Sequence, residues 1–183
     1  MDVREIDLRT SLLGLPLSWP VVIAPMGGLI LFHPEGDREM ARGAAQGDTL
    51  QFLSGAAGWS VEDLATASPG PKMFQLYHHG DRQLDHTQGS IDALPPIVDT
   101  VAGRAAIVVD GGFTRGTAVL KGLALGATVV AVGRTVLWGL AADGAAGVAC
   151  ALDILRRGLR TTMALAGQTS VKNLDRDLVF RVD

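Results

Sequence analysis

The chain contains the stretch Val108-Val109-Asp110-Gly111-Gly112-Phe113-Thr114-Arg115-Gly116-Thr117 and, shortly after it, Ala131-Val132-Gly133-Arg134. Each stretch is an apolar β-branched run that breaks at glycine and continues into a helical pattern. Glycine lets backbone N–H groups approach an anion, and the N-terminus of the following helix adds partial positive charge. Arg115 and Arg134 would add side-chain charge. In a (β/α)8 barrel the loops after the last two strands commonly bind phosphate, so the pair predicts the end of such a barrel and a phosphorylated cofactor.

These glycines also have a plainer explanation. Tight connections between strands and helices use glycine whether or not a ligand is present. The glycine turns alone therefore leave both readings open.

Composition favours a single α/β domain over residues 1–183, since 48% of the 183 residues are hydrophobic. The net charge of −3, without a block of Lys and Arg, argues against nucleic acid or an anionic membrane as partner and favours a small molecule. The single cysteine, Cys150, has no partner for an intramolecular disulfide, and the charged first residues do not resemble a signal peptide. The apolar stretch 19–32 is too short to cross a bilayer. We therefore expect a cytoplasmic protein without a membrane segment.

Strand and helix patterns alternate along the whole chain, which predicts a parallel sheet with right-handed crossovers. We expect strands at 20–25, 49–54, 73–77, 105–109 and 128–132, and helices at 36–46, from 60 onward, at 91–102, at 117–125 and through most of 136–165. A closed barrel needs eight such strands and about 250 residues. The fold class predicted is therefore α/β, an incomplete (β/α)8 TIM barrel with about five parallel strands alternating with helices.

Nine segments, in order, resemble the FMN-dependent 2-hydroxy-acid oxidases and dehydrogenases, the family of glycolate oxidase, lactate oxidase and mandelate dehydrogenase. They are Ile23-Ala24-Pro25-Met26-Gly27, His33-Pro34-Glu35-Gly36, Phe74-Gln75-Leu76-Tyr77, His79-Gly80-Asp81-Arg82-Gln83-Leu84-Asp85, Ile91-Asp92-Ala93-Leu94-Pro95, Asp110-Gly111-Gly112, Leu123-Ala124-Leu125-Gly126-Ala127, Gly133-Arg134 and Met163-Ala164-Leu165-Ala166-Gly167. The resemblance covers nearly all of the chain. It implies a (β/α)8 fold, FMN as cofactor, and oxidation of a small 2-hydroxy acid to the 2-oxo acid.

The resemblance also implies a large internal deletion. Tyr77 matches the end of the family's third strand and His79 the segment just after its sixth, with one residue between them. The junction 77–82 fits both family segments, as a deletion between two similar stretches would leave it. The third and seventh strands then become candidate neighbours. An open sheet is the alternative, and its exposed edges would invite pairing with a second copy of the chain.

The resemblance assigns roles to particular residues. His79 matches the catalytic base, and Arg82 and Tyr77 match substrate contacts. A histidine suits proton transfer near neutral pH and an arginine binds a carboxylate through two parallel hydrogen bonds, although on spacing alone a histidine is more often a solvated side chain. The cofactor-binding positions implied are Pro25, Met26, Gly27, Ser54, Gln75, Asp110, Gly111, Gly112, Arg115, Gly133 and Arg134. No metal ligand is implied.

Two departures from the family weaken this reading. Thr114 stands where the family has an arginine, and the family's lysine after the fifth strand has no counterpart among Lys72, Lys121 and Lys172. Loss of a preorganised electrostatic group commonly costs on the order of a hundredfold in rate. The expected function is therefore impaired FMN-dependent oxidation, and the alternative is an inactive remnant that serves as a binding or assembly module or has no function.

Overall fold

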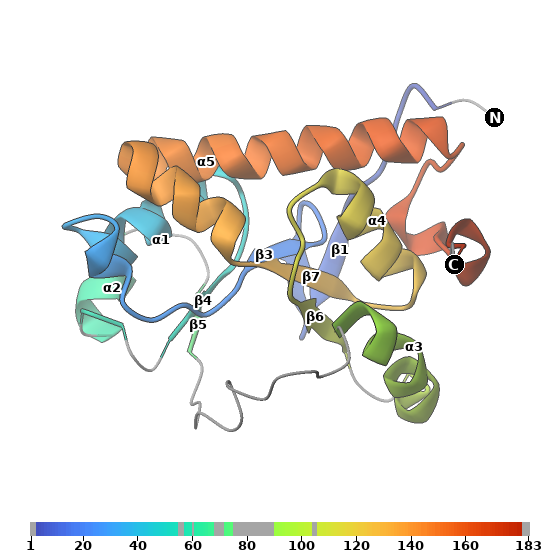
Figure 1. Ribbon diagram of the computed structural model, residues 1–183, viewed down its shortest axis with the longest axis horizontal. Helices are drawn as coiled ribbons and strands as arrows, with labels where there is room; N and C mark the ends of the chain where they lie inside the picture. Colours follow the sequence, from blue (N-terminus) through green and yellow to red (C-terminus); the bar gives the residue numbers. More distant parts are fainter. Residues whose placement is uncertain are drawn as a thin grey trace.

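The structure of the protein is a computed structural model, and it describes residues 3–54, 57–59, 61–67, 72–74, 90–103 and 106–180. Its centre is a five-stranded sheet with the order β5-β4-β3-β7-β6, in which every neighbouring pair is parallel (Figure 1). The strands are β3 (Val21–Ile23), β4 (Gln51–Leu53), β5 (Lys72–Phe74), β6 (Val108–Asp110) and β7 (Val129–Val132). The helices are α1 (Gly36–Gln46), α2 (Val61–Ala67), α3 (Ser90–Val101), α4 (Gly116–Ala124) and α5 (Arg134–Leu165), with short 3-10 turns at Leu29–Leu31, Val171–Asn173 and Arg176–Leu178.

The two faces of the sheet are covered differently. On one face, alternate strand residues such as Ile23 and Val130 join the larger core cluster with residues of α1, α4 and α5. On the other face, Val22 and Val129 pack with Leu12 and Leu17. These two leucines belong to a hairpin of β1 (Thr10–Leu12) and β2 (Leu15–Leu17), so the hairpin covers the face that would be the interior of a complete barrel.

The predicted alternation of strands and helices is confirmed, with one strand displaced. The strand expected at 105–109 begins only at Val108. Ile107 lies outside the ladder because its N–H donates to the hydroxyl of Thr128 at 2.9 Å. The expected strand 73–77 is seen as β5 up to Phe74, and residues 75–77 lie outside the described part.

The third and seventh strands of the expected barrel do not pair. They correspond to β5 and β6, which form opposite edges of the sheet. The physical reason is that β7 pairs with β3 over three residues, Val21 opposite Val130 through Ile23 opposite Val132, as the last strand of a barrel pairs with the first. Within the described residues the sheet therefore keeps barrel order and stays open.

Helix α5 is the one helix in the described ranges that is long and apolar enough, by length and composition, to cross a membrane. Two residues with non-helical backbone angles, Asp143 and Gly144, divide it. Its buried residues, among them Leu152 and Leu159, belong to the same core cluster as the sheet. Helix α5 therefore packs as a core helix against α1 and α4.

Candidate phosphate-binding site

The described cofactor-binding candidates gather at one edge of the sheet. Residues 25–27 follow β3, Ser54 follows β4, Asp110 ends β6 and Gly133 follows β7. Because these strands are all parallel, their carboxyl ends meet at the same edge, which is where ligands bind in such sheets. Sequence positions more than 100 residues apart are thus brought together.

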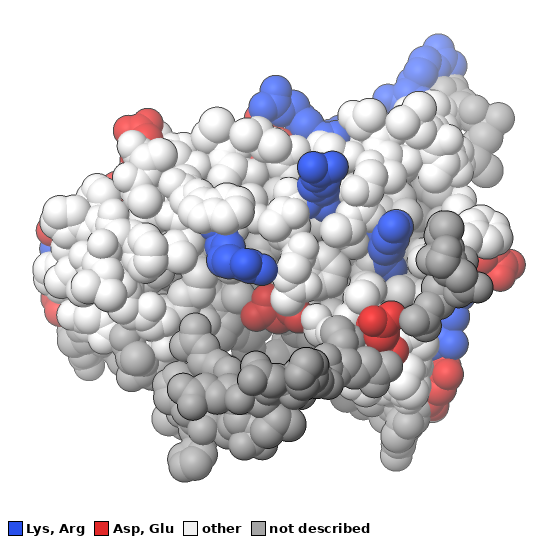
Figure 2. Space-filling view, viewed as in Figure 1, with Lys and Arg blue, Asp and Glu red and all other residues white. Residues whose placement is uncertain are grey.

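Two helix N-termini open at this edge. Helix α4 begins after Arg115 and α5 begins after Gly133, and neither flanking residue provides a side-chain cap for the first turn. The first N–H groups of a helix lack partners inside the helix and carry partial positive charge, so an anion satisfies them well. Figure 2 shows basic side chains over the beginnings of both helices.

Arg115 and Arg134 stand beside these N-termini and are exposed. Neither makes a salt bridge with any carboxylate in the described ranges. Their positive charges therefore remain available to an anion. The two arginines and the two uncapped helix N-termini therefore place positive charge and hydrogen-bond donors at the same edge of the sheet.

The loop after β6 needs its two glycines. Gly111 and Gly112 have φ angles of 117° and 80°, values that L side chains rarely adopt. A Cβ atom at Gly111 would lie 2.6 Å from the hydroxyl oxygen of Ser90 at the start of α3. A Cβ atom at Gly112 would meet nothing within 4 Å. The backbone at Gly112 is therefore open to close approach by a ligand.

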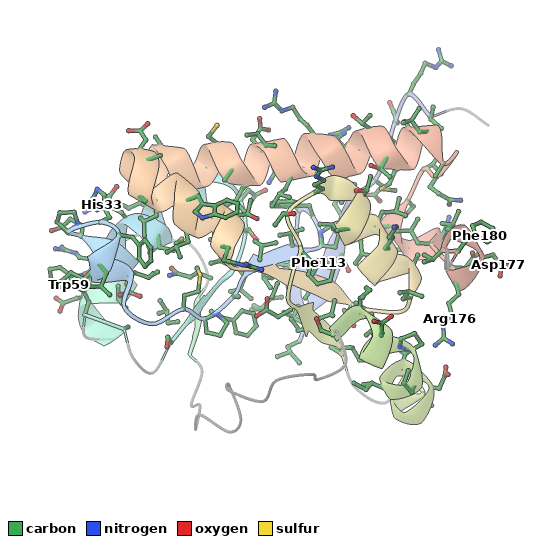
Figure 3. The ribbon with its side chains drawn as sticks, in the orientation of Figure 1. His33, Trp59, Phe113, Arg176, Asp177 and Phe180 are labelled. Carbon is green, nitrogen blue, oxygen red and sulfur yellow. The ribbon has the colours of Figure 1, made fainter. Side chains whose placement is uncertain are left out.

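The two glycine loops are joined by contacts that sequence reasoning missed. The hydroxyl of Thr135 donates to the carbonyl oxygen of Phe113 at 3.3 Å, which connects the first turn of α5 to the loop before α4. The Phe113 ring is buried against Gly122 of α4 (Figure 3). A Cβ atom at Gly133 would lie 3.5 Å from the sulfur of Met26, so the loop after β3 joins the same cluster. The only available sequence signal for Thr135 was its place directly after Gly133 and Arg134.

Asp110 lies at the start of the first loop. Burial among protein atoms raises the pKa of its carboxyl group, and the N–H of Gly111 opposes this by donating a hydrogen bond to the carboxylate. Asp110 as a whole remains exposed to solvent, and solvent screening moderates the effect. The carboxylate of Asp110 therefore holds the backbone at Gly111 through this hydrogen bond.

The predicted catalytic and substrate-binding residues belong to a part of the chain that the structure does not describe. His79, Arg82, Tyr77 and the cofactor candidate Gln75 lie outside the described residues. Pro25, Met26 and Ser54 are described, and they are half-buried just after β3 and β4.

Comparison with known families shows which family the chain belongs to. The family model described as FMN-dependent dehydrogenase matches residues 1–81 and again 78–181. The chain belongs to the FMN-dependent dehydrogenase family. The two matched stretches overlap at residues 78–81, inside the junction that resembles two family segments at once.

Curated relatives of this family member match it over different shares of its length. It is 46% identical to L-lactate oxidase of Nostoc sp. over 188 residues, which covers 94% of this chain and 52% of the relative. It is 50% identical to human 2-hydroxyacid oxidase 1 over 102 residues, covering 56% of this chain and 28% of the relative. The chain thus spans about half of the length of the lactate oxidase.

Glycolate oxidase 2 of Oryza sativa subsp. indica is 28% identical over an alignment of 299 positions, covering 96% of this chain and 81% of the relative. This chain has 183 residues, so at least 116 of the 299 positions have no residue here. Among solved structures, a mandelate oxidase variant with an FMN adduct superposes with a TM-score of 0.89 at 25% identity, covering 96% of this chain and 83% of that one. A long internal gap inside a retained barrel arrangement fits these values.

Proposed function

We propose that the chain binds FMN at the carboxyl edge of the sheet. The observation that carries this proposal is the convergence on one edge of two uncapped helix N-termini and two exposed arginines, Arg115 and Arg134, which form no salt bridge with a described carboxylate. These groups, with the backbone amides of Gly111, Gly112 and Gly133, would hold the ribityl phosphate. Family membership supports FMN as the phosphorylated ligand.

The remaining residues at the edge would hold the ring system. Pro25, Met26 and Gly27 follow β3 and would lie against the ring, and Ser54 would hydrogen-bond to it. Gln75 has the same role by resemblance.

The reaction proposed is the oxidation of a small 2-hydroxy acid to the 2-oxo acid. His79 would take the hydroxyl proton, and Arg82 with Tyr77 would hold the substrate carboxylate. Bound FMN supplies an acceptor for the hydride equivalent, which balances the two electrons that the substrate loses. The named relatives include oxidases of lactate, glycolate and other 2-hydroxy acids, which supports this substrate class.

We propose that turnover is weak compared with that of complete relatives. The chain provides no lysine in the context where the family holds one after its fifth strand. A second candidate function is an FMN-binding or assembly module without turnover. The missing lysine favours it, and so does the described sheet, which is open and has two edge strands. Exposed strand edges would then recruit a second copy of the chain.

Binding and turnover can be tested separately. In equilibrium dialysis of the whole chain, we expect FMN to bind at least about tenfold more tightly than riboflavin, because charge-assisted hydrogen bonds contribute about 1.5–3 kcal/mol. Equal affinity for both flavins would overturn the phosphate site. Anaerobic mixing with L-lactate or glycolate should then bleach the bound flavin in the native chain and not in His79→Ala. Tight FMN binding without bleaching would establish the binding-module alternative.

A further inference from the structure

A second site lies at the opposite end of the sheet from the proposed cofactor edge. It is a pocket of about 470 Å³ whose lining includes Ser18, which precedes β3, together with Arg156 and Arg160 of α5 and residues 5–9. Because Ser18 lies before β3, the pocket is at the amino ends of the strands. Its volume lies in the range of small-molecule sites. None of the residues proposed for FMN binding or for hydroxy-acid oxidation lines this pocket.

Arg156 is fixed at the pocket by contacts that leave one donor unused. Its guanidinium stacks on the ring of buried Trp19, 4.7 Å from the ring centre, and one terminal nitrogen donates to the carbonyl oxygen of Gly47. Its Nε–H is buried and has no hydrogen-bond acceptor within the described structure. Because the Nε–H is enclosed, a ligand in the pocket would meet the terminal guanidinium nitrogens of Arg156, which the stacking on Trp19 holds in place.

Arg160 lies one helical turn beyond Arg156 and also lines the pocket. It is exposed and forms no ion pair with a described carboxylate. The two arginines thus present two positive charges on one face of α5.

The acidic residues of the lining do not neutralise these charges. Asp7 is held by Arg9 through two hydrogen bonds of 2.8 Å and 3.1 Å. That ion pair lowers the pKa of Asp7 to about 2, so the pair stays ionised and neutral overall at physiological pH. Glu5 is the one other acid in the lining. One carboxylate therefore faces two arginines, and the pocket keeps a net positive charge.

We propose that this pocket binds a small organic anion through Arg156 and Arg160. The ligand class is a small molecule with a carboxylate or phosphate group, because both groups accept the parallel hydrogen bonds that guanidinium offers. Ligand oxygens would accept hydrogen bonds from terminal guanidinium nitrogens of Arg156 and of Arg160, the two arginines that line the pocket.

The test follows the Nε–H resonance of Arg156 by NMR while the 183-residue chain is titrated with inorganic phosphate and, separately, with malonate at constant ionic strength. We expect saturable shifts. Arg160→Gln should weaken affinity about tenfold or more, as expected for loss of one charge-assisted hydrogen bond. The matched control is Arg157→Gln on the same helix, because Arg157 pairs with Asp153 at 3.0 Å and does not line the pocket.

Each outcome has a defined meaning. If the resonance shift saturates with phosphate alone or with malonate alone, the pocket recognises that anionic group. If it saturates with both, the pocket recognises the negative charge that the two ligands have in common. Shifts that do not saturate, or that are the same in Arg160→Gln as in the native chain, would overturn the site. Since FMN phosphate would bind at the other edge, the Arg156 resonance reports on this pocket independently of cofactor binding.

Discussion

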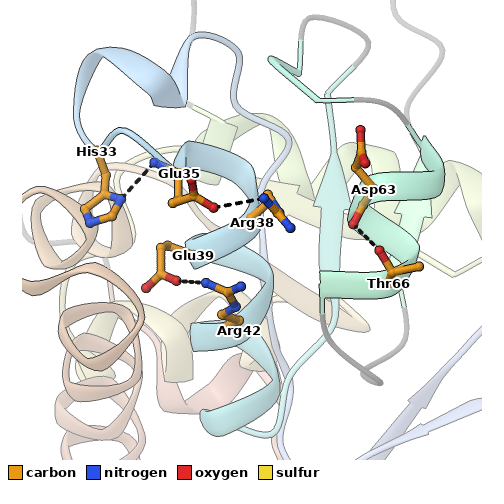
Figure 4. Close-up of polar contacts among 7 residues, drawn as sticks. All are labelled: His33, Glu35, Arg38, Glu39, Arg42, Asp63 and Thr66. Carbon is orange, nitrogen blue, oxygen red and sulfur yellow. Dashed lines mark hydrogen bonds and ion pairs between the residues drawn. The ribbon is translucent and has the colours of Figure 1, made fainter.

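The carboxylate of Glu39 on α1 accepts a hydrogen bond of 2.9 Å from the backbone N–H of Ala145 on α5. This contact lies where α5 breaks at Asp143 and Gly144, so Glu39 caps the second half of α5 from another helix. The other carboxylate oxygen accepts from Arg42 (Figure 4). One side chain therefore joins α1 to the break that lets α5 turn across the sheet.

Glu39→Gln should destabilise the protein by about 1–2 kcal/mol at neutral pH, because the cap loses its charge. The Ala145 and Arg42 hydrogen bonds lower the pKa of Glu39 in the folded state. Its contribution is therefore present above the unfolded-state pKa and is lost as the pH falls through the lower folded-state value. Urea unfolding at several pH values should show the difference between native and variant shrinking in acid. Glu35→Gln is the control, because Glu35 pairs with Arg38 at 41% exposure and should matter little. An equal cost at all pH values would contradict the charged cap.

Gly144→Ala should cost roughly 2–4 kcal/mol. Gly144 has φ 48° and ψ −134°, and a Cβ atom there would lie 2.9 Å from a carboxylate oxygen of Glu39. Gly167→Ala is the comparison, because Gly167 also has a positive φ, 67°, and no described atom lies within 4 Å of its Cβ position. That control should cost about 1–2 kcal/mol. Similar thermal shifts for both variants would show that the Glu39 cap tolerates the methyl group.

The contact between α4 and α5 should depend more on Gly116 of α4 than on Gly158 of α5. A Cβ atom at Gly116 would lie 2.0 Å from the backbone nitrogen of Leu159, which is inside van der Waals contact with a rigid helix. A Cβ atom at Gly158 would be 3.3 Å from its nearest neighbour, the nitrogen of Gly116. We expect Gly116→Ala to cost about 3 kcal/mol or more and to weaken FMN binding, because it moves the start of α4, whereas Gly158→Ala should change stability by less than about 1 kcal/mol. Chemical denaturation measures the loss of stability in both variants. A larger loss for Gly158→Ala than for Gly116→Ala would contradict the prediction and would indicate that the two helices can move apart at Gly116.

Arg115→Gln and Arg134→Gln should each weaken FMN about tenfold to a hundredfold while leaving the affinity for riboflavin unchanged. Both arginines stand at helix N-termini on the proposed phosphate edge. Lys121→Gln serves as the control, since Lys121 lies in the last turn of α4. Fluorescence titration with both flavins measures the effect. A parallel loss of riboflavin affinity would indicate a damaged fold instead of a lost phosphate contact.

Much of the secondary structure was predictable, because local patterns dominate it. The helix at 36–46 has the predicted bounds, and the strands around Ile23 and Val130 follow from short β-branched runs. The β1–β2 hairpin was missed because its signals are unusual. Pro16 lies within β2, and in the two-residue turn Gly14 has a φ of 81° but Leu13 also takes a positive φ, 50°, where glycine, asparagine or aspartate is the ordinary residue.

Residue type and spacing along the chain were enough to predict the order of strands and helices, the glycine turns after β6 and β7, and the resemblance to the family. Only the tertiary structure decided which strands became edges, since pairing of β7 with β3 joins segments more than 100 residues apart. It also brought Glu39 to the break in α5, Thr135 to Phe113, and Arg156 to Trp19. Such contacts depend on packing between distant helices and strands, and no local periodicity encodes them.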